Sequence, residues 1–127
     1  MAIGVGDKFP SGAFVKMNAE GPAPITTEEF FGGKKVVLFG VPGAFTPPCS
    51  EKHLPGFVEK AAQIKTKGVD IIACLSVNDV FVMTAWGKDQ NVGESIEMLA
   101  DGSAAIIKKL GTVLDLTDRG LGVRSSR

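Results

Sequence analysis

The run Lys35-Val36-Val37-Leu38-Phe39-Gly40 is the feature of the sequence that most restricts the fold. Its central residues are all apolar, so apolar and polar positions do not alternate as they do in a half-exposed strand. Unbroken apolarity over the length of a strand is typical of a central strand whose two faces are both covered. Helices on both sides of a sheet provide that cover, and the run therefore predicts an α/β domain.

The rest of the chain alternates between helical and strand patterns. Apolar residues at spacings of three and four predict a helix over Ser50–Lys67, in which Pro55 is expected to cause a kink. The other expected elements are short strands around Lys8–Lys16 and Ala23–Thr26, a capped helical turn at Thr27–Phe31, strands at Val69–Leu75 and Ile96–Ala100, and helices from Asn78 or Asp79 toward Gln90 and over Ala104–Leu110. Elements in this order predict an α/β sandwich with parallel pairing at its centre.

Length, charge and cysteine content narrow the classes of function. The 127 residues suit one domain, 1–127. Fourteen basic and fourteen acidic residues balance, and no basic cluster marks a nucleic-acid surface. The apolar runs are too short to cross a membrane, and the N-terminus has no signal-peptide pattern. Two cysteines without C-x-x-C spacing are no disulfide scaffold, so the cytosol is the default compartment.

The segment from Gly40 to Cys49 carries the clearest chemical signal. Its three prolines and two glycines predict a stiff turn at the edge of the sheet, where α/β proteins tend to place their sites. Cys49 then falls in the first turn of the next helix, where unpaired N–H groups and the helix dipole lower a thiol pKa. Thr46, three residues earlier, can direct its hydroxyl at the sulfur or at a bound substrate. A neighbouring arginine would complete such a site.

Plainer interpretations stay open for both residues. A lone cysteine at a helix start is often a small, partly buried apolar side chain. A threonine before a helix is more often a cap than a catalytic group. The stiff turn that joins Thr46 to Cys49 favours an activated thiol, but it does not select a substrate.

Pro42, Thr46 and Cys49 reproduce the spacing P-x-x-x-T-x-x-C, and with it the chain resembles the peroxiredoxins. The longer run Phe39–Pro47 looks like their atypical type II, or peroxiredoxin-5-like, subfamily. The resemblance covers essentially the whole chain. Its further matches are Val5-Gly6-Asp7, His53-Leu54-Pro55-Gly56-Phe57, the Cys74–Asp79 strand end, Ala85-Trp86-Gly87 and Gly120–Ser125.

The resemblance implies a thioredoxin-like fold, with a central mixed sheet flanked by helices, and reduction of hydrogen peroxide and alkyl hydroperoxides. Cys49 would attack the peroxide and become a sulfenic acid. Thr46 and Arg127 would hold the peroxide, with Arg124 as the second choice for the arginine, and Pro42 would shield the sulfenic acid. Glutathione, glutaredoxin or thioredoxin would reduce the oxidised cysteine. The family also implies a homodimer and neither a metal nor another cofactor.

The chain departs from the family in length. Relatives continue past Arg127 with a strand hairpin and a C-terminal helix, so we expect a C-terminally truncated chain. The missing strands would pair with the central sheet and cover one side of the site. Exposed edges and apolar surface should then favour instability or association. A real truncation would put peroxidase activity in question even with Cys49 in place.

Four other residues have more than one interpretation. Cys74 lies in an apolar strand and is interpreted as a core residue rather than as a resolving cysteine. His53 could share a helix face with Cys49 as in a Cys–His hydrolase, but surface or interface packing is preferred. Phe81 and Trp86 are expected in the core or at a dimer contact, with a pocket wall as a further role.

Two other functions remain alternatives to the peroxidase. A thiol–disulfide oxidoreductase could use the same fold, although the chain has no C-x-x-C motif. A non-catalytic interaction or holdase fragment is suggested by the short C-terminus alone.

Overall fold

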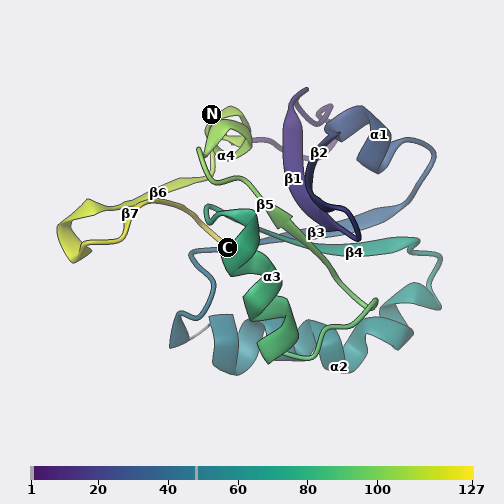
Figure 1. The fold of residues 1–127 in the computed structure, drawn as a ribbon. Helices are drawn as coiled ribbons and strands as arrows, with labels where there is room; N and C mark the ends of the chain where they lie inside the picture. Colours follow the sequence, from purple (N-terminus) through teal and green to yellow (C-terminus); the bar gives the residue numbers. More distant parts are fainter. Residues whose placement is uncertain (1, 48) are drawn as a thin grey trace.

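A mixed five-stranded sheet forms the centre of the molecule (Figure 1). The computed structural model describes residues 2–47 and 49–127, apart from the side chain of Cys49. Along the sheet the strands are ordered β2-β1-β5-β4-β3. Strands β3, β4 and β5 run parallel, whereas β1 is antiparallel to both of its neighbours. The strands are Ala13–Asn18 (β1), Gly21–Thr26 (β2), Val36–Val41 (β3), Ile71–Ser76 (β4) and Glu97–Ala100 (β5).

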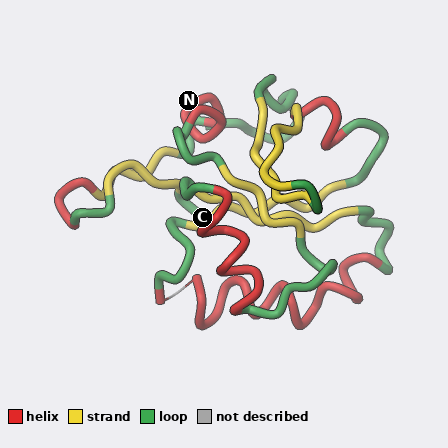
Figure 2. Tube along the Cα trace, viewed as in Figure 1, coloured by secondary structure: helices red, strands yellow, loops and turns green. Residues whose placement is uncertain are grey.

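Helices cover both faces of this sheet (Figures 1 and 2). On one face lie α2 and α3, and on the other lie α1 and α4. Their bounds are Thr27–Phe31 (α1), Leu54–Lys65 (α2), Val80–Asp89 (α3) and Ala105–Leu110 (α4). This arrangement confirms the expected sandwich with a mixed central sheet and parallel pairing at its middle. Within the described residues, no helix is both long enough and apolar enough to span a bilayer.

Each face of the sheet has its own apolar core. Phe39, Leu54 and Trp86 belong to the core beneath α2 and α3. Phe14 and Ile107 belong to the core beneath α1 and α4. Alternate residues of β3 and β4 point into these two cores, which explains why both strands are apolar at successive positions.

Strand β3 packs against an apolar core on each face, as expected, although four of its six residues are only half-buried; its predicted central position is wrong. Among the described residues it pairs only with β4 and ends the strand order. Burial of both faces requires helices above and below the strand and does not require a second neighbouring strand. The apolar run therefore indicated the layers correctly without fixing the place of β3 in the sheet.

The expected Ser50–Lys67 helix consists of two parts. A wider π-helical segment, η1, spans Cys49–His53, and α2 follows directly from Leu54. Pro55 lies in the first turn of α2, and because η1 continues directly into α2, its missing N–H removes a donor from a helix that has already begun. The irregularity attributed to a proline kink is therefore a change of helix type just before Pro55.

A hairpin between residues 113 and 125 was not predicted. Strands β6 (Val113–Leu116) and β7 (Gly122–Ser125) form a separate two-stranded sheet joined by a 3-10 turn, η2 (Thr117–Arg119). The hairpin projects from the body of the molecule (Figures 1 and 2). Its strands have only four residues each and alternate between half-buried and exposed positions, so they lack the apolar run that marked β3.

Candidate active site

The predicted site lies where β3 ends and the chain turns toward η1. Pro42 is half-buried directly after β3, and Gly43 is buried. Phe45 adopts a left-handed backbone conformation, with φ of 64°, and half of its side chain is exposed. Cys49 is the first residue of η1, which agrees with its predicted place at a helix start. Its side chain lies outside the described part of the structure.

Thr46 closes the turn before Cys49. Its hydroxyl donates a hydrogen bond of 2.6 Å to the carbonyl oxygen of Gly43. Its own carbonyl oxygen accepts from the backbone N–H of Ser50 at 2.9 Å. The hydroxyl proton is thus used within the turn, while the oxygen lone pairs can still accept from a bound substrate.

Asn78 ties this turn to the end of β4. Its Oδ1 accepts from the backbone N–H of Ala44 at 3.0 Å and from the hydroxyl of Ser76 at 2.6 Å. Sequence reasoning considered Asn78 only as a helix cap. Asp79 takes that role through a 2.9 Å bond from the N–H of Val82. An asparagine just beyond a strand end was the available signal, but its partner lies 34 residues away.

Trp86, on α3, forms a hydrogen bond to the first turn of η1. Its indole N–H donates to the hydroxyl of Ser50 at 2.9 Å, and its side chain is fully buried in α3. The ring of Phe45 lies 6.5 Å from it. The expected core position is confirmed for Trp86. It is wrong for Phe81, which is 65% exposed, and a dimer contact or a pocket wall are its remaining interpretations.

His53, four residues after Cys49, is buried in part and lies within the electrostatic influence of Arg127. Burial, and then the positive charge of Arg127, lower the pKa of His53 from its ordinary value. The imidazole of His53 packs against two phenyl rings. Its centroid lies 5.1 Å from that of Phe39 and 5.6 Å from that of Phe57. Arg127, at the end of the described chain, is therefore close enough to His53 for its charge to act on that residue.

The side chain of His53 packs mainly against aromatic rings. Its Nδ1 is buried and has no hydrogen-bond partner among the described residues. A catalytic imidazole needs a partner on that atom to fix its tautomer and orientation. The packing against two phenyl rings therefore agrees with the preferred interpretation of His53 as a packing residue.

Arg124 is engaged elsewhere. Its Nε donates to the carbonyl oxygen of Leu121 at 2.8 Å, and its Nη1 donates to that of Val77 at 3.3 Å. A guanidinium that is bound to two backbone carbonyls has fewer donors left for a substrate. Arg127 stays the predicted arginine of the site, with Arg124 as the second choice.

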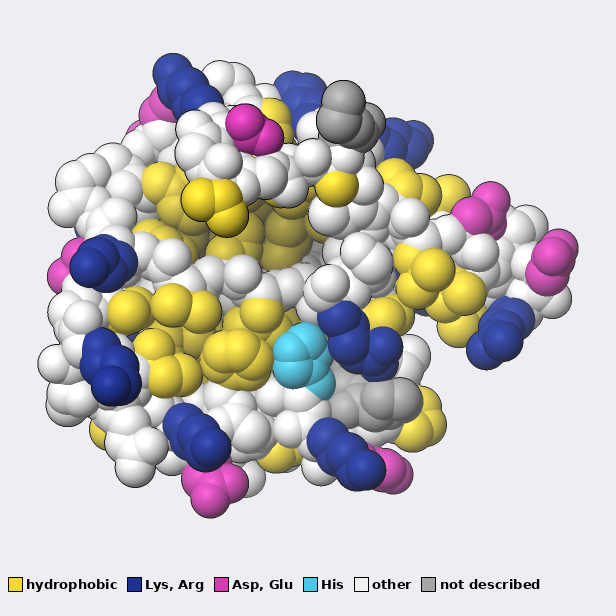
Figure 3. Space-filling model, turned by 180° about the vertical axis from the view of Figure 1, so that it is seen from behind, with side chains coloured by type: hydrophobic (Ala, Val, Ile, Leu, Met, Phe, Trp, Pro, Cys, Tyr) yellow, Lys and Arg dark blue, Asp and Glu magenta, His cyan; other side chains and the backbone are white. Residues whose placement is uncertain are grey.

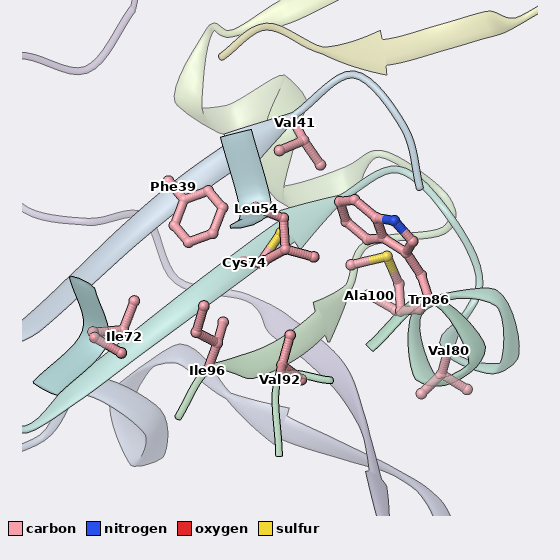
Figure 4. Packing of buried hydrophobic residues seen from close by; sticks show 12 residues of the cluster. Phe39, Val41, Leu54, Ile72, Cys74, Val80, Trp86, Val92, Ile96 and Ala100 are labelled. Atoms are coloured by element: carbon pink, nitrogen blue, oxygen red, sulfur yellow. The ribbon is translucent and has the colours of Figure 1, made fainter. Parts of the chain in front are cut away.

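Cys74 is completely buried in the core on β4. It lies opposite Phe39 in the β3–β4 register, and Figure 4 shows its side chain beside Leu54. This position agrees with the preferred interpretation of a core cysteine. An external thiol could reach its sulfur only if the core opened.

Two cavities flank the sheet. One, of about 370 Å³, is lined by Arg127 and Gly40 at one end and by apolar residues such as Leu38 and Leu75 along the rest. Figure 3 shows apolar side chains gathered on this side of the molecule. The other, of about 540 Å³, lies among β1, α3 and β5 and includes none of the predicted site residues. Arg127 thus lines the first cavity, and its charge also acts on His53.

Comparison with known proteins identifies the family. The Redoxin family model matches residues 4–127. Peroxiredoxin-2B of Arabidopsis thaliana is 53% identical, over 98% of this chain and 78% of its own length. The chain belongs to the peroxiredoxin family. Peroxiredoxin-2E of the same plant, named chloroplastic, is 48% identical over 99% of this chain and 56% of its own length.

A solved structure agrees in fold. The reduced Prx3 of Vibrio vulnificus in complex with hydrogen peroxide is 52% identical and superimposes with a TM-score of 0.94, over 98% of this chain and 78% of that one. The expected thioredoxin-like fold is thereby confirmed. This peroxiredoxin spans little more than half the length of the chloroplastic peroxiredoxin-2E. It spans about four fifths of peroxiredoxin-2B and of the Prx3 chain. Identity of about half over nearly the whole chain supports a thiol-dependent peroxidase.

Proposed function

We propose that this peroxiredoxin reduces hydrogen peroxide and alkyl hydroperoxides, with Cys49 as the attacking residue. The observation that carries the proposal is the place of Cys49 as the first residue of η1, three residues after Thr46. A thiolate there is stabilised by backbone N–H groups and by the positive end of the helix dipole. The family relationship supplies the choice of peroxide as substrate.

The reaction takes place in two stages. The Cys49 thiolate forms a bond to one peroxide oxygen while the O–O bond breaks, and the second oxygen leaves as hydroxide or alkoxide and takes up a proton. Cys49 becomes a sulfenic acid, and water or an alcohol is released. A reducing thiol then displaces water to form a mixed disulfide, and a second thiol releases the Cys49 thiolate and leaves as a disulfide.

Three residues support the first stage. Thr46 accepts a hydrogen bond from the peroxide O–H through the lone pairs that its bond to Gly43 leaves unused. Arg127 stabilises the thiolate and the negative charge that develops on the leaving oxygen. Pro42, half-buried beside the turn, limits the access of other reactants to the sulfenic acid.

The recycling thiol comes from outside the chain. The complete burial of Cys74 supports a one-cysteine cycle, because its sulfur is enclosed by the side chains of the core. We propose glutathione, glutaredoxin or thioredoxin as reductant.

The motif from Phe39 to Pro47 supports membership of the type II subfamily, and the exposed Phe81 supports a homodimer. The cytosol is the proposed compartment, with an organelle as the alternative that the name of the chloroplastic relative suggests.

Peroxide consumption with each reductant in turn tests this function. The wild-type chain should consume hydrogen peroxide and tert-butyl hydroperoxide with at least one of the three, and Cys49→Ser should abolish this consumption. Cys74→Ala is the matched control and should keep most of the activity. Equal turnover by the wild type and Cys49→Ser would overturn the proposal. Disulfide reduction without any peroxide consumption would favour a thiol–disulfide oxidoreductase.

A further inference from the structure

We infer that Arg124 is a positioning residue, which fixes the end of β7, and with it Arg127, against the turn that carries Thr46. The inference rests on the proposed function, because that function assigns Thr46 and Arg127 to the peroxide. Arg124 itself is not placed in contact with substrate. It acts through the relative position of two segments that lie far apart in the sequence.

The guanidinium of Arg124 bridges the hairpin and the body of the molecule. Nε donates to Leu121 within the hairpin at 2.8 Å, and Nη1 donates to Val77 between β4 and α3 at 3.3 Å. The second bond spans 47 residues of sequence. A planar guanidinium presents these donors in a fixed fork, so it can hold both carbonyls at once, which a lysine ammonium on its flexible stem cannot do in the same geometry.

Gly43 leaves the space that this guanidinium needs. A methyl group on Gly43 would lie 2.9 Å from Nη1 of Arg124 and 3.2 Å from the methyl carbon of Thr46. The φ angle of Gly43 is outside the left-handed region, so backbone conformation alone does not call for glycine here. Its role is to allow close approach, and the group that approaches is Arg124, next to Thr46.

The segment between β4 and α3 also binds the turn that carries Thr46. Val77 accepts from Arg124, and the adjacent Asn78 accepts from the N–H of Ala44 within the turn. Two neighbouring residues between β4 and α3 therefore anchor both segments. The turn and the end of β7 cannot shift relative to each other without breaking one of these bonds.

Arg127 follows three residues after this anchor. The backbone between them is held tightly, because Ser125 is buried and the N–H of Ser126 donates to the carbonyl of Thr112 at 2.8 Å. Gly40 admits this backbone, since a methyl group there would lie 2.9 Å from Oγ of Ser125. Loss of the Arg124 anchor should therefore move Arg127 relative to Thr46 and Cys49.

Substitution of Arg124 tests the inference with two readouts on the folded chain. One is the rate constant of the reaction with hydrogen peroxide. The other is the pH dependence of iodoacetamide alkylation at Cys49, followed by mass spectrometry of the Cys49 peptide. Arg119, exposed at the hairpin tip, provides the matched control Arg119→Met. A purely structural role for Arg124 would lower thermal stability without moving the alkylation midpoint.

We expect Arg124→Met to slow the peroxide reaction by about tenfold or more, because displacements near 1 Å can cost up to about a hundredfold. The alkylation midpoint should rise, by about one pH unit, as the cation of Arg127 moves away from the thiolate. Arg124→Lys should fall between Arg124→Met and the wild type. Arg119→Met should match the wild type in both readouts.

Gly43→Ala supplies an independent test, because it fills the space of the guanidinium without removing it. It should slow the peroxide reaction in the wild type. In the Arg124→Met background only the part of the effect that comes from the methyl carbon of Thr46, 3.2 Å away, should remain, so that the two substitutions are not additive. Full additivity would contradict the assigned contact. In this double-mutant cycle, the Gly43→Ala variant alone still contains the native Arg124.

The outcomes separate this inference from the proposed function. If the wild type does not react with peroxide, the proposed function fails, and the alkylation midpoints still decide the role of Arg124. If Arg124→Met folds and equals Arg119→Met in both readouts, the inference is overturned. If Arg124→Met does not fold, Arg124→Lys decides, and its equality with the wild type in both readouts overturns the inference.

Discussion

Trp86 and Ser50 are joined by a hydrogen bond of 2.9 Å from the indole N–H to the hydroxyl oxygen. The bond connects α3 to the residue immediately after Cys49, across 36 residues of sequence. Trp86 is fully buried, so its N–H has no access to water. The start of η1 is thus fixed from the core side by Trp86, in addition to the bond between Ser50 and Thr46 on the chain side.

Ser50→Ala should destabilise the fold, because it leaves the buried indole N–H without an acceptor. A buried unsatisfied donor costs about 1–3 kcal/mol, and the free energy of unfolding in urea should fall by that amount. Ser103→Ala, at an exposed serine, is the control and should change little. The tryptophan emission of Ser50→Ala should also shift, since the fluorophore loses its partner. Equal stability of the two variants would show that the bond contributes nothing.

Asn78 permits a test that separates hydrogen bonding from charge. Asn78→Leu removes the acceptor of both Ala44 and Ser76, so it should lower the unfolding free energy by about 1–3 kcal/mol and slow the peroxide reaction. Asn78→Asp keeps an acceptor oxygen and should retain more stability. Its added negative charge should raise the pKa of the Cys49 thiol. Stability is measured in urea and the thiol pKa by alkylation; similar behaviour of both variants would argue against the assigned bonds.

His53 should make stability depend on pH. Burial and the charge of Arg127 lower its pKa in the folded chain, whereas the unfolded chain keeps the ordinary value of about 6.5. Between these two values the unfolded chain binds more protons, so the contribution of His53 is complete above pH 6.5 and is lost as the pH falls through the folded pKa. The free energy of unfolding of the wild type should therefore decrease toward acid.

His53→Phe is the comparison variant for this pH dependence, because it retains aromatic packing against Phe39 and Phe57 and cannot titrate. Urea midpoints measured from pH 8 to pH 5 should fall more steeply for the wild type than for the variant. Parallel curves would mean that His53 has the same pKa in both states.

Cys74 should be dispensable for the chemistry but not for packing. Cys74→Ala removes a buried sulfur and leaves a small cavity, which should cost on the order of 1 kcal/mol of stability. Peroxide turnover with an external thiol should continue. Mass spectrometry of the peroxide-treated wild type under limiting reductant checks the same point. A Cys49–Cys74 disulfide as the main product would replace the one-cysteine cycle by an intramolecular one.

Local patterns predicted the elements of this fold better than their arrangement. The unbroken apolarity of β3 and the stripe of α2 follow from residues close in sequence, and so does the place of Cys49 after a turn rich in proline. The edge position of β3 depends on which strands neighbour it, and strand order is not encoded in β3 itself. The short strands of the β6–β7 hairpin alternate too weakly to be recognised.

The candidate site shows the same division. Thr46, Cys49 and Pro42 were found because they lie within eight residues of each other. The contacts of Asn78 with Ala44, of Trp86 with Ser50 and of Arg124 with Val77 join segments 34 to 47 residues apart. Such bonds depend on the assembled sheet, and a single sequence gives no signal that pairs their members.

Trapping of the oxidised cysteine tests the central claim most directly. The reduced chain is treated with one equivalent of hydrogen peroxide in the presence of dimedone, and the adduct is located by mass spectrometry. We predict one dimedone adduct per chain, on the peptide that contains Cys49, with the loss of one peroxide and with no adduct in Cys49→Ser. An adduct on Cys74, or peroxide loss at the same rate without Cys49, would contradict the assignment of Cys49 as the attacking residue.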